Sequence, residues 1–289
     1  MIDTGLKNKV VLITGVNNPY GIGAAVARAF TAEGAAVFAT YLRLPAVPST
    51  TNIPGESFYR AQNAKTAEEV IATIRGRGGR IEAGEADLAD PASIPLLFDQ
   101  AEKTFGPVDV LVNNAAHCDP DTFLPQSRLG AESHAADNFP MSTITADKHD
   151  VHFAVNSRAV ALMMAEYAHR YIERNAHWGR IINISTDGAS GFSSEVSYGA
   201  SKHAMESYSR AAANELGKYG ITVNIVSLGA VQTGWISPEL EKQEAYTMPL
   251  GHVGKPEDVA NVILFFASNQ AGWVTGQLLY VDGGHVMPL

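Results

Sequence analysis

Residues 10–30 constrain the fold of this chain more than any other segment. Val10–Ile13 is an apolar run, rich in β-branched residues, of the kind that forms a strand buried on both faces of a parallel sheet. It leads into Thr14–Gly15, then Gly21–Gly23, and then residues 24–30, for which the sequence predicts a helix. This order is the dinucleotide-binding pattern, because the glycines allow close backbone approach and the helix N-terminus offers free N–H groups to a pyrophosphate.

Strand-like and helical segments alternate along the rest of the chain. The alternation predicts an α/β fold, a single-domain Rossmann-like doubly wound parallel sheet with helices on both faces. The 289 residues are 46% hydrophobic and no linker divides them, so we expect one domain spanning 1–289. The predicted strands are Val10–Ile13, Ala36–Thr40, Val108–Val112, Gly179–Ile184, Ile221–Val226 and Gln277–Val281.

A phenol and an amine lie one helical turn apart at Tyr198 and Lys202, so both project from the same helix face. A phenol normally loses its proton near pH ~10, and a charged neighbour favours the phenolate. Ser185, thirteen positions before Tyr198, could hold a carbonyl or alcohol oxygen beside the pair. The three groups suit hydride chemistry at a C=O/CH–OH centre, although a Tyr–Lys pair alone is also common on helix surfaces.

Together these features resemble the short-chain dehydrogenase/reductase family, and the resemblance covers nearly the whole chain. It is also carried by Asp87–Leu88 and Asn113–Ala116, which look like the family's strand-end motifs. Near the C-terminus, Pro249–Ala260 and Val274–Gly284 look like the closing segments of the 3-oxoacyl-[acyl-carrier-protein] reductase-like branch. The resemblance implies a reaction between NADP(H) and a carbonyl or secondary alcohol, with a 3-oxoacyl thioester or another ketone as the carbonyl substrate.

The resemblance also implies the roles of a catalytic tetrad, Asn156, Ser185, Tyr198 and Lys202. Tyr198 would give a proton to the carbonyl oxygen that Ser185 polarises. Lys202 would hold the nicotinamide ribose and stabilise the phenolate, and Asn156 would hold a water that links Lys202 to solvent. The predicted cofactor contacts are Gly15, Asn17, Tyr20, Gly21, Ile22, Tyr41, Arg43, Asp87, Leu88, Asn114, Ala115, Ala116, Tyr198, Lys202, Gly229, Val231 and Thr233.

The sequence departs from the family pattern in three places. Five residues, 16–20, separate Gly15 from Gly21 where three are usual, Ala116 replaces a glycine, and Leu228 replaces a proline. The longer loop is reminiscent of enoyl reductases, which typically place Tyr and Lys seven positions apart. Because that position holds Glu195, carbonyl reduction is favoured. Enoyl-thioester reduction and a non-catalytic NADP(H) sensor are the alternatives.

The second strand predicts the choice of nicotinamide cofactor. NAD enzymes usually carry an acid at the end of this strand, where it bonds the ribose 2′-OH. Here Tyr41 takes that place and Arg43 follows it, so no carboxylate is expected to repel a 2′-phosphate and a guanidinium is expected to pair with it. The sequence therefore predicts NADP(H) over NAD(H). In the alternative, Arg43 points to solvent and either cofactor binds.

Charge and composition limit the partners. A formal charge of −9 disfavours nucleic acid and anionic membrane surfaces, and no apolar run approaches the ~20 residues that span a bilayer. No signal peptide is evident, and the single Cys118 fits a cytoplasmic location. No metal site is expected, since no metal-binding motif is present. By analogy with relatives, we expect a homotetramer or homodimer.

Two connections, about 44–64 and 117–144, are longer than the family resemblance leads us to expect. Both leave the carboxyl ends of strands, the edge where ligands bind in such sheets. The first is expected near the adenosine end of the cofactor. The second forms either a wall over the substrate or a surface excursion or subunit contact. The sequence does not identify the substrate, because a cyclic ketone, a sugar or a polyketide would use the same tetrad as a 3-oxoacyl thioester.

Overall fold

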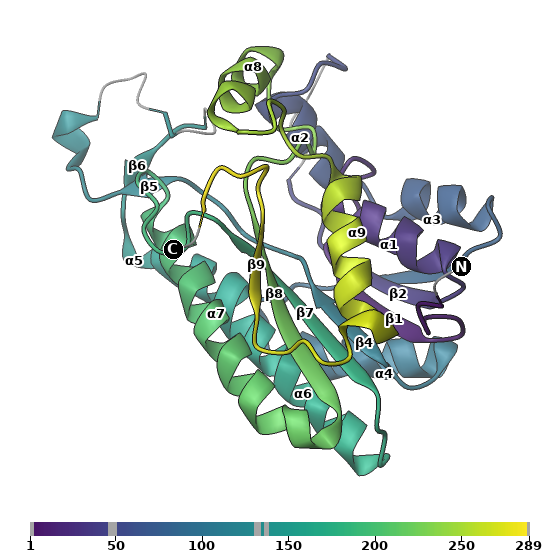
Figure 1. Ribbon diagram of the computed structural model, residues 1–289. Coiled ribbons are helices and arrows are strands. Elements are labelled where there is room, and N and C mark those ends of the chain that lie inside the picture. The colour runs from purple at the N-terminus through teal and green to yellow at the C-terminus, as the bar shows by residue number, and fades with distance from the viewer. Residues whose placement is uncertain (1–2, 46–50, 130–133, 136–138, 288–289) are drawn as a thin grey trace.

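The computed structural model describes residues 3–45, 51–129, 134–135 and 139–287, which form an α/β fold around one parallel sheet. The strand order is β3-β2-β1-β4-β7-β8-β9, and every pairing is parallel (Figure 1). The chain builds outward from β1 to β3, then crosses to β4 on the other side of β1, which confirms the doubly wound prediction. The strands are β1 Val10–Thr14, β2 Ala36–Tyr41, β3 Arg80–Glu85, β4 Val110–Asn113, β7 Gly179–Thr186, β8 Ile221–Leu228 and β9 Leu278–Val281.

Helices cover both faces of the sheet (Figure 1). Val11 and Ile13 of β1 pack with α1, α3 and α9, whereas Val10 and Leu12 pack with α4, α6 and α7. Successive residues of a strand face opposite sides, so a strand covered on both sides must be apolar throughout. The helices are α1 Ile22–Ala32, α3 Glu68–Arg75, α4 Ser93–Phe105, α6 Val160–Glu173, α7 Val196–Leu216, α8 Pro238–Thr247 and α9 Pro256–Ala267.

All six predicted strands are present, with ends displaced by no more than about two residues. The sequence missed β3, which forms one edge of the sheet. Of its six residues, only Ile81 is buried. An edge strand has one neighbour and partial cover, so its mostly polar sequence carries no clear strand signal.

The first insertion contains a helix, α2 Glu56–Asn63. The N–H of Gly55 donates to the carbonyl of Gly234, 2.9 Å away, and the Asn17 side chain donates to the carbonyl of Asn63. The insertion leaves the carboxyl end of β2, where the adenosine end of a cofactor was expected. Its helix, however, packs on the glycine turn and on the segment that follows β8.

The second insertion contains a small parallel sheet of β5 Asp121–Thr122 and β6 Ser142–Thr143. The ring of Phe139 lies edge-on to the ring of Tyr59 in α2, with 6.5 Å between the ring centroids. The two insertions therefore touch each other. Residues 46–50 of the first insertion, and 130–133 and 136–138 of the second, lie outside the described residues.

Candidate active site

The predicted site residues gather at the carboxyl edge of the sheet, because parallel strands end at the same edge. Thr14 joins the ends of β1 and β4, because its hydroxyl accepts hydrogen bonds from the N–H groups of Asn114 and Ala115 at 3.0 and 2.9 Å. The end of β7 meets helix α7, where the Lys202 Nζ donates to the carbonyl of Ile184 at 2.7 Å. The ends of β1, β4 and β7 and the first turns of α7 thus form one site.

The glycine turn has the geometry of a phosphate cradle. Gly15 has a φ of +77°, and a Cβ added there would lie 3.0 Å from the Cα of Ala115. A Cβ added at Gly23 would collide with the carbonyl of Gly15. Gly21 is the N-cap residue of α1, so free N–H groups of the first helical turn open onto the turn. These features fit a dinucleotide pyrophosphate.

The five-residue loop between Gly15 and Gly21 is tied to its surroundings by two buried amides. Asn17 donates to the carbonyls of Asn63 and Lys65, so its side chain supports α2. Asn18 donates to the carbonyl of Thr233 at 3.0 Å. Asn18 was not among the predicted contacts, and no local pattern identifies it, because its partner is 215 positions away.

Lys202 is buried, and its Nζ lies 5.7 Å from the centre of the Tyr198 ring. Burial lowers the pKa of Lys202 to about 8, although Cys118 and Glu206 act in the opposite direction. Burial raises the pKa of Tyr198 well above its usual value, and Cys118, Glu195 and other neighbours raise it further. In this structure the pKa of Tyr198 is therefore raised rather than brought towards neutral pH. Burial away from water and the nearby acidic groups both disfavour the negatively charged phenolate. The Lys202 ammonium is directed at a backbone carbonyl.

Ser185 lies at the end of β7 with its hydroxyl directed at an unexpected partner. Its Oγ donates to the Glu206 carboxylate at 2.7 Å, and both side chains are buried. The hydroxyl proton expected at a substrate oxygen is thus held by Glu206. The next residue, Thr186, accepts the N–H of Gly188 at 3.3 Å. Within the part of the chain that the structure describes, no hydrogen bond takes the Thr186 hydroxyl proton.

Asn156 lies in a π-helical turn, Ala154–Ala159, that joins α5 Ala146–Phe153 to α6. Its Oδ1 accepts the N–H of His117, and its Nδ2 donates to the carbonyl of His117 and to the hydroxyl of Ser201. Ser201 in turn donates to the carbonyl of Tyr198. The Asn156 side chain thus fastens the loop after β4 to helix α7.

Arg43 has a carboxylate partner that the sequence did not predict. Its Nε lies 2.9 Å from each oxygen of Glu85, and its terminal nitrogen lies 2.9 Å from one of them. The register of the two parallel strands aligns Tyr41 with Glu85. The expectation of a carboxylate-free strand end is therefore wrong. The acid comes from β3, the strand that the sequence missed.

The other predicted cofactor residues lie at the same edge, and several of them make hydrogen bonds or close contacts within the protein. Asn114 donates to the carbonyls of Thr14 and Gly15, and Asp87 accepts the N–H of Ala89. Gly229 lies so close to Asp282 that an added Cβ would be 2.8 Å from the Asp282 side chain. Tyr20 is half exposed, with its ring edge-on to that of Phe58 in α2. The remaining residues, Ile22, Leu88, Ala116, Val231 and Thr233, follow strand ends or begin α1.

Three comparisons decide the family. A family model described as enoyl-(acyl carrier protein) reductase matches residues 55–285. An uncharacterized oxidoreductase of Bacillus subtilis, YjdA, is 31% identical over 283 residues, which cover 97% of this chain and 98% of that protein. The solved structure of a short-chain dehydrogenase/reductase from Serratia marcescens has a TM-score of 0.76 at 31% identity, covering 97% and 98% of the two chains. This chain belongs to the short-chain dehydrogenase/reductase family.

Members of this family are oxidoreductases that use nicotinamide cofactors, and the glycine cradle of this short-chain dehydrogenase/reductase fits such a group. A second solved structure is that of a blue fluorescent protein from a metagenomic library in complex with NADPH. It has a TM-score of 0.76 at 30% identity and covers 98% of this chain and 99% of that one.

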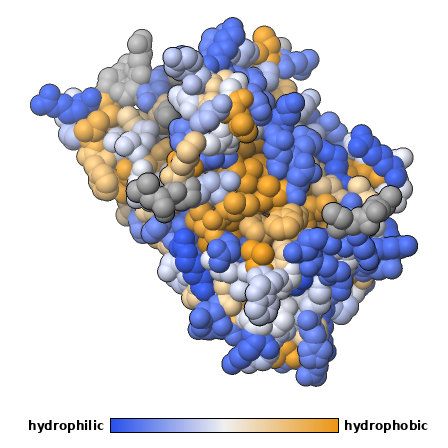
Figure 2. Space-filling model, viewed as in Figure 1, coloured by the Kyte–Doolittle hydropathy of each residue, from blue (hydrophilic) through white to orange (hydrophobic). Residues whose placement is uncertain are grey.

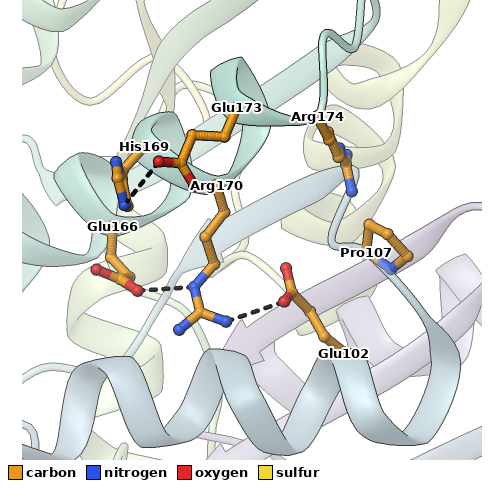
Figure 3. A pocket seen from close by; sticks show the side chains of 7 residues that line it. All are labelled: Glu102, Pro107, Glu166, His169, Arg170, Glu173 and Arg174. Atoms are coloured by element: carbon orange, nitrogen blue, oxygen red, sulfur yellow. Dashed lines mark hydrogen bonds and ion pairs between the residues drawn. The ribbon is translucent and has the colours of Figure 1, made fainter.

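The surface also carries a pocket and an apolar region. A pocket between α4 and α6 is lined by Glu102, Pro107, Glu166, His169, Arg170, Glu173 and Arg174, and it contains none of the predicted site residues (Figure 3). In the space-filling view, apolar side chains gather over β9 and along α9, below α8 (Figure 2). Among the described helices, none is long and apolar enough to cross a membrane.

Proposed function

We propose that this short-chain dehydrogenase/reductase interconverts a carbonyl compound and a secondary alcohol, with NADP(H) preferred over NAD(H). The observation that carries the proposal is Tyr198 beside the buried Lys202 at the carboxyl edge, next to a glycine cradle that fits a dinucleotide. When bound, the nicotinamide would supply or accept the hydride. The protein would supply position, charge and the proton.

Tyr198 is the proposed proton donor in the reductive direction. The phenol is protonated at neutral pH, which is the form from which it can give a proton to a carbonyl oxygen. Lys202, with a pKa of about 8, carries its charge at neutral pH. We assign it the ribose hydroxyls and the phenolate that forms as Tyr198 gives up its proton.

We assign the hydroxyl that holds the substrate oxygen to Thr186 rather than to Ser185. The Ser185 proton is held by the buried Glu206 carboxylate, whereas no described group takes the Thr186 proton. Ser185 then serves to hold the Glu206 carboxylate, whose charge opposes the lowering of the Lys202 pKa. Asn156 is a positioning residue, because its amide joins the His117 loop to Ser201, one residue before Lys202.

For the cofactor, we propose that the backbone around Gly15 and Gly21 holds the pyrophosphate and that Arg43 meets the 2′-phosphate of NADP(H). The NADPH complex of the similar blue fluorescent protein supports this choice. The proposed substrate is a 3-oxoacyl thioester or another ketone. Its pocket would lie beside the second insertion and the segment after Thr233. We further propose a cytoplasmic homotetramer.

Enoyl-thioester reduction is the second candidate, favoured by the description of the matching family model. The arrangement of α7 argues against it. A tyrosine seven positions before Lys202 would be needed, and the residue there is Glu195, whose carboxylate accepts from Cys118 at 3.4 Å. A non-catalytic sensor would bind NADP(H) without turnover.

Oxidation of NADPH and of NADH should be followed with a panel of 3-oxoacyl thioester mimics, cyclic ketones, aldoses and an enoyl thioester mimic. Turnover of a carbonyl compound that is faster with NADPH than with NADH is the expected result. Turnover of the enoyl compound alone would favour the second candidate. Tight NADPH binding without turnover of any compound would favour the sensor.

A further inference from the structure

The ribose end of the proposed cofactor site carries a cation that already has a carboxylate partner. Arg43 and Glu85 form a two-pronged ion pair across the ends of β2 and β3. Their side chains are 54% and 32% exposed, so both can be reached from solvent. Of the nearest cations in the first insertion, Arg60 pairs with Glu56 and Lys65 pairs with Glu69. Arg43 and Glu85 are thus the charged pair positioned to face a ribose 2′ substituent.

The ion pair between Arg43 and Glu85 opposes the binding of a phosphate to Arg43. Glu85 bonds both the Arg43 guanidinium and its backbone N–H, the latter at 3.1 Å. A phosphate that pairs with the same guanidinium must share it with the carboxylate or displace it. It must also approach a like charge, which costs free energy. A 2′-hydroxyl meets neither penalty, since it is neutral and can donate to the carboxylate.

We propose that Glu85 is a specificity-determining residue that limits the preference for NADP(H) by competing with the 2′-phosphate for Arg43. This inference rests on the proposed function, because it assumes that the adenosine ribose binds at the ends of β2 and β3. Its consequence is that the protein accepts NAD(H) as well as NADP(H). Removal of the Glu85 charge should therefore increase the selectivity for NADP(H).

The test is a set of nucleotide-binding titrations in the absence of any substrate. Kd values for NADPH and NADH are measured for the wild type, Glu85→Gln, Arg43→Ala and the double variant. Glu85→Gln should bind NADPH about fivefold more tightly, the size expected for an exposed ion pair, with the Kd for NADH changed by less than about twofold. The gain should be smaller in the Arg43→Ala background and should shrink at high salt.

Glu82→Gln is the matched control. Glu82 belongs to the same strand and also pairs with an arginine, Arg75. It lies three residues before Glu85, about 10 Å along the strand and on the opposite face of the sheet. This variant makes the same change in charge and should leave the ratio of the two Kd values unchanged.

The outcomes separate the inference from the proposed function. If the wild type binds both nucleotides but Glu85→Gln leaves the Kd ratio unchanged, or Glu82→Gln changes it equally, the inference is overturned and the proposed function stands. If the wild type binds neither nucleotide, the proposed function is overturned and the inference with it.

Discussion

At the scale of single residues, the buried Lys202 determines how the site responds to pH. Burial lowers the pKa of Lys202 to about 8, and Glu206 opposes that change. The lysine is therefore charged below pH 8 and loses its charge as the pH rises through that value. We expect kcat/KM for NADPH, which reports the free enzyme, to fall above about pH 8.

Glu206→Gln tests this assignment. Without the carboxylate, the pKa of Lys202 should fall further, so the alkaline limb of the pH profile should move down by about one pH unit. Glu215→Gln, an exposed position on the same helix, is the control and should leave the profile in place. Equal profiles for all three proteins would show that Lys202 does not set the alkaline limb.

The two hydroxyls at the end of β7 can be separated by substitution. Thr186→Ala should lower kcat by about 100-fold or more, because the substrate oxygen loses a positioned donor, and Thr186→Ser should restore most of the activity. Ser185→Ala should have the smaller effect. Steady-state kinetics with the best carbonyl substrate decide the point, and a larger loss in Ser185→Ala would reverse the assignment.

The sequence predicted the residue types of the site better than their partners. Tyr198 and Lys202 could be paired because an i, i+4 spacing on one helix fixes their relation locally. The partners of Ser185 and Arg43 could not be predicted, since Glu206 and Glu85 lie 21 and 42 positions away. Their contacts depend on helix packing and strand register, and β3 was not recognised as a strand.

At the scale of elements, an ion-pair network joins α4 to α6. Arg170 contacts Glu166 on its own helix and Glu102 on α4 at 2.7 and 2.9 Å (Figure 3). It also contacts Asp99 on α4 at 2.8 Å. Arg170→Ala would leave three carboxylates close together and remove the contact with the ring of Phe98. We expect the free energy of unfolding to fall by about 1–2 kcal/mol, and by less at high salt.

Urea denaturation measures this loss, with Arg60→Ala as its control. Arg60 forms an exposed pair with Glu56 within α2, at 47% and 40% exposure. That substitution should change the unfolding free energy by less than about 0.5 kcal/mol. Equal losses in the two variants would mean that the three-carboxylate network adds nothing to the packing of α4 on α6.

At the scale of the whole molecule, the doubly wound sheet could be predicted because burial on both faces leaves a clear apolar signal in β1, β7 and β8. The arrangement of the insertions could not. Contacts such as that between Tyr59 and Phe139 join segments with no shared periodicity, so only the folded chain brings them together.

The proposed homotetramer is a prediction about the whole molecule. Size-exclusion chromatography with light scattering should give a mass four times that of the 30.8 kDa chain. A mass of two chains would support the homodimer instead, and a monomer at micromolar concentration would contradict both forms.

The most direct test of the account is the substitution Tyr198→Phe, measured for both turnover and NADPH binding. Tyr208→Phe, which changes a half-exposed tyrosine on the same helix, is the matched control. We predict that Tyr198→Phe loses at least about 1,000-fold in kcat and keeps its NADPH Kd within about threefold, whereas Tyr208→Phe keeps both. Substantial carbonyl reduction by Tyr198→Phe would contradict the central claim that this phenol supplies the proton.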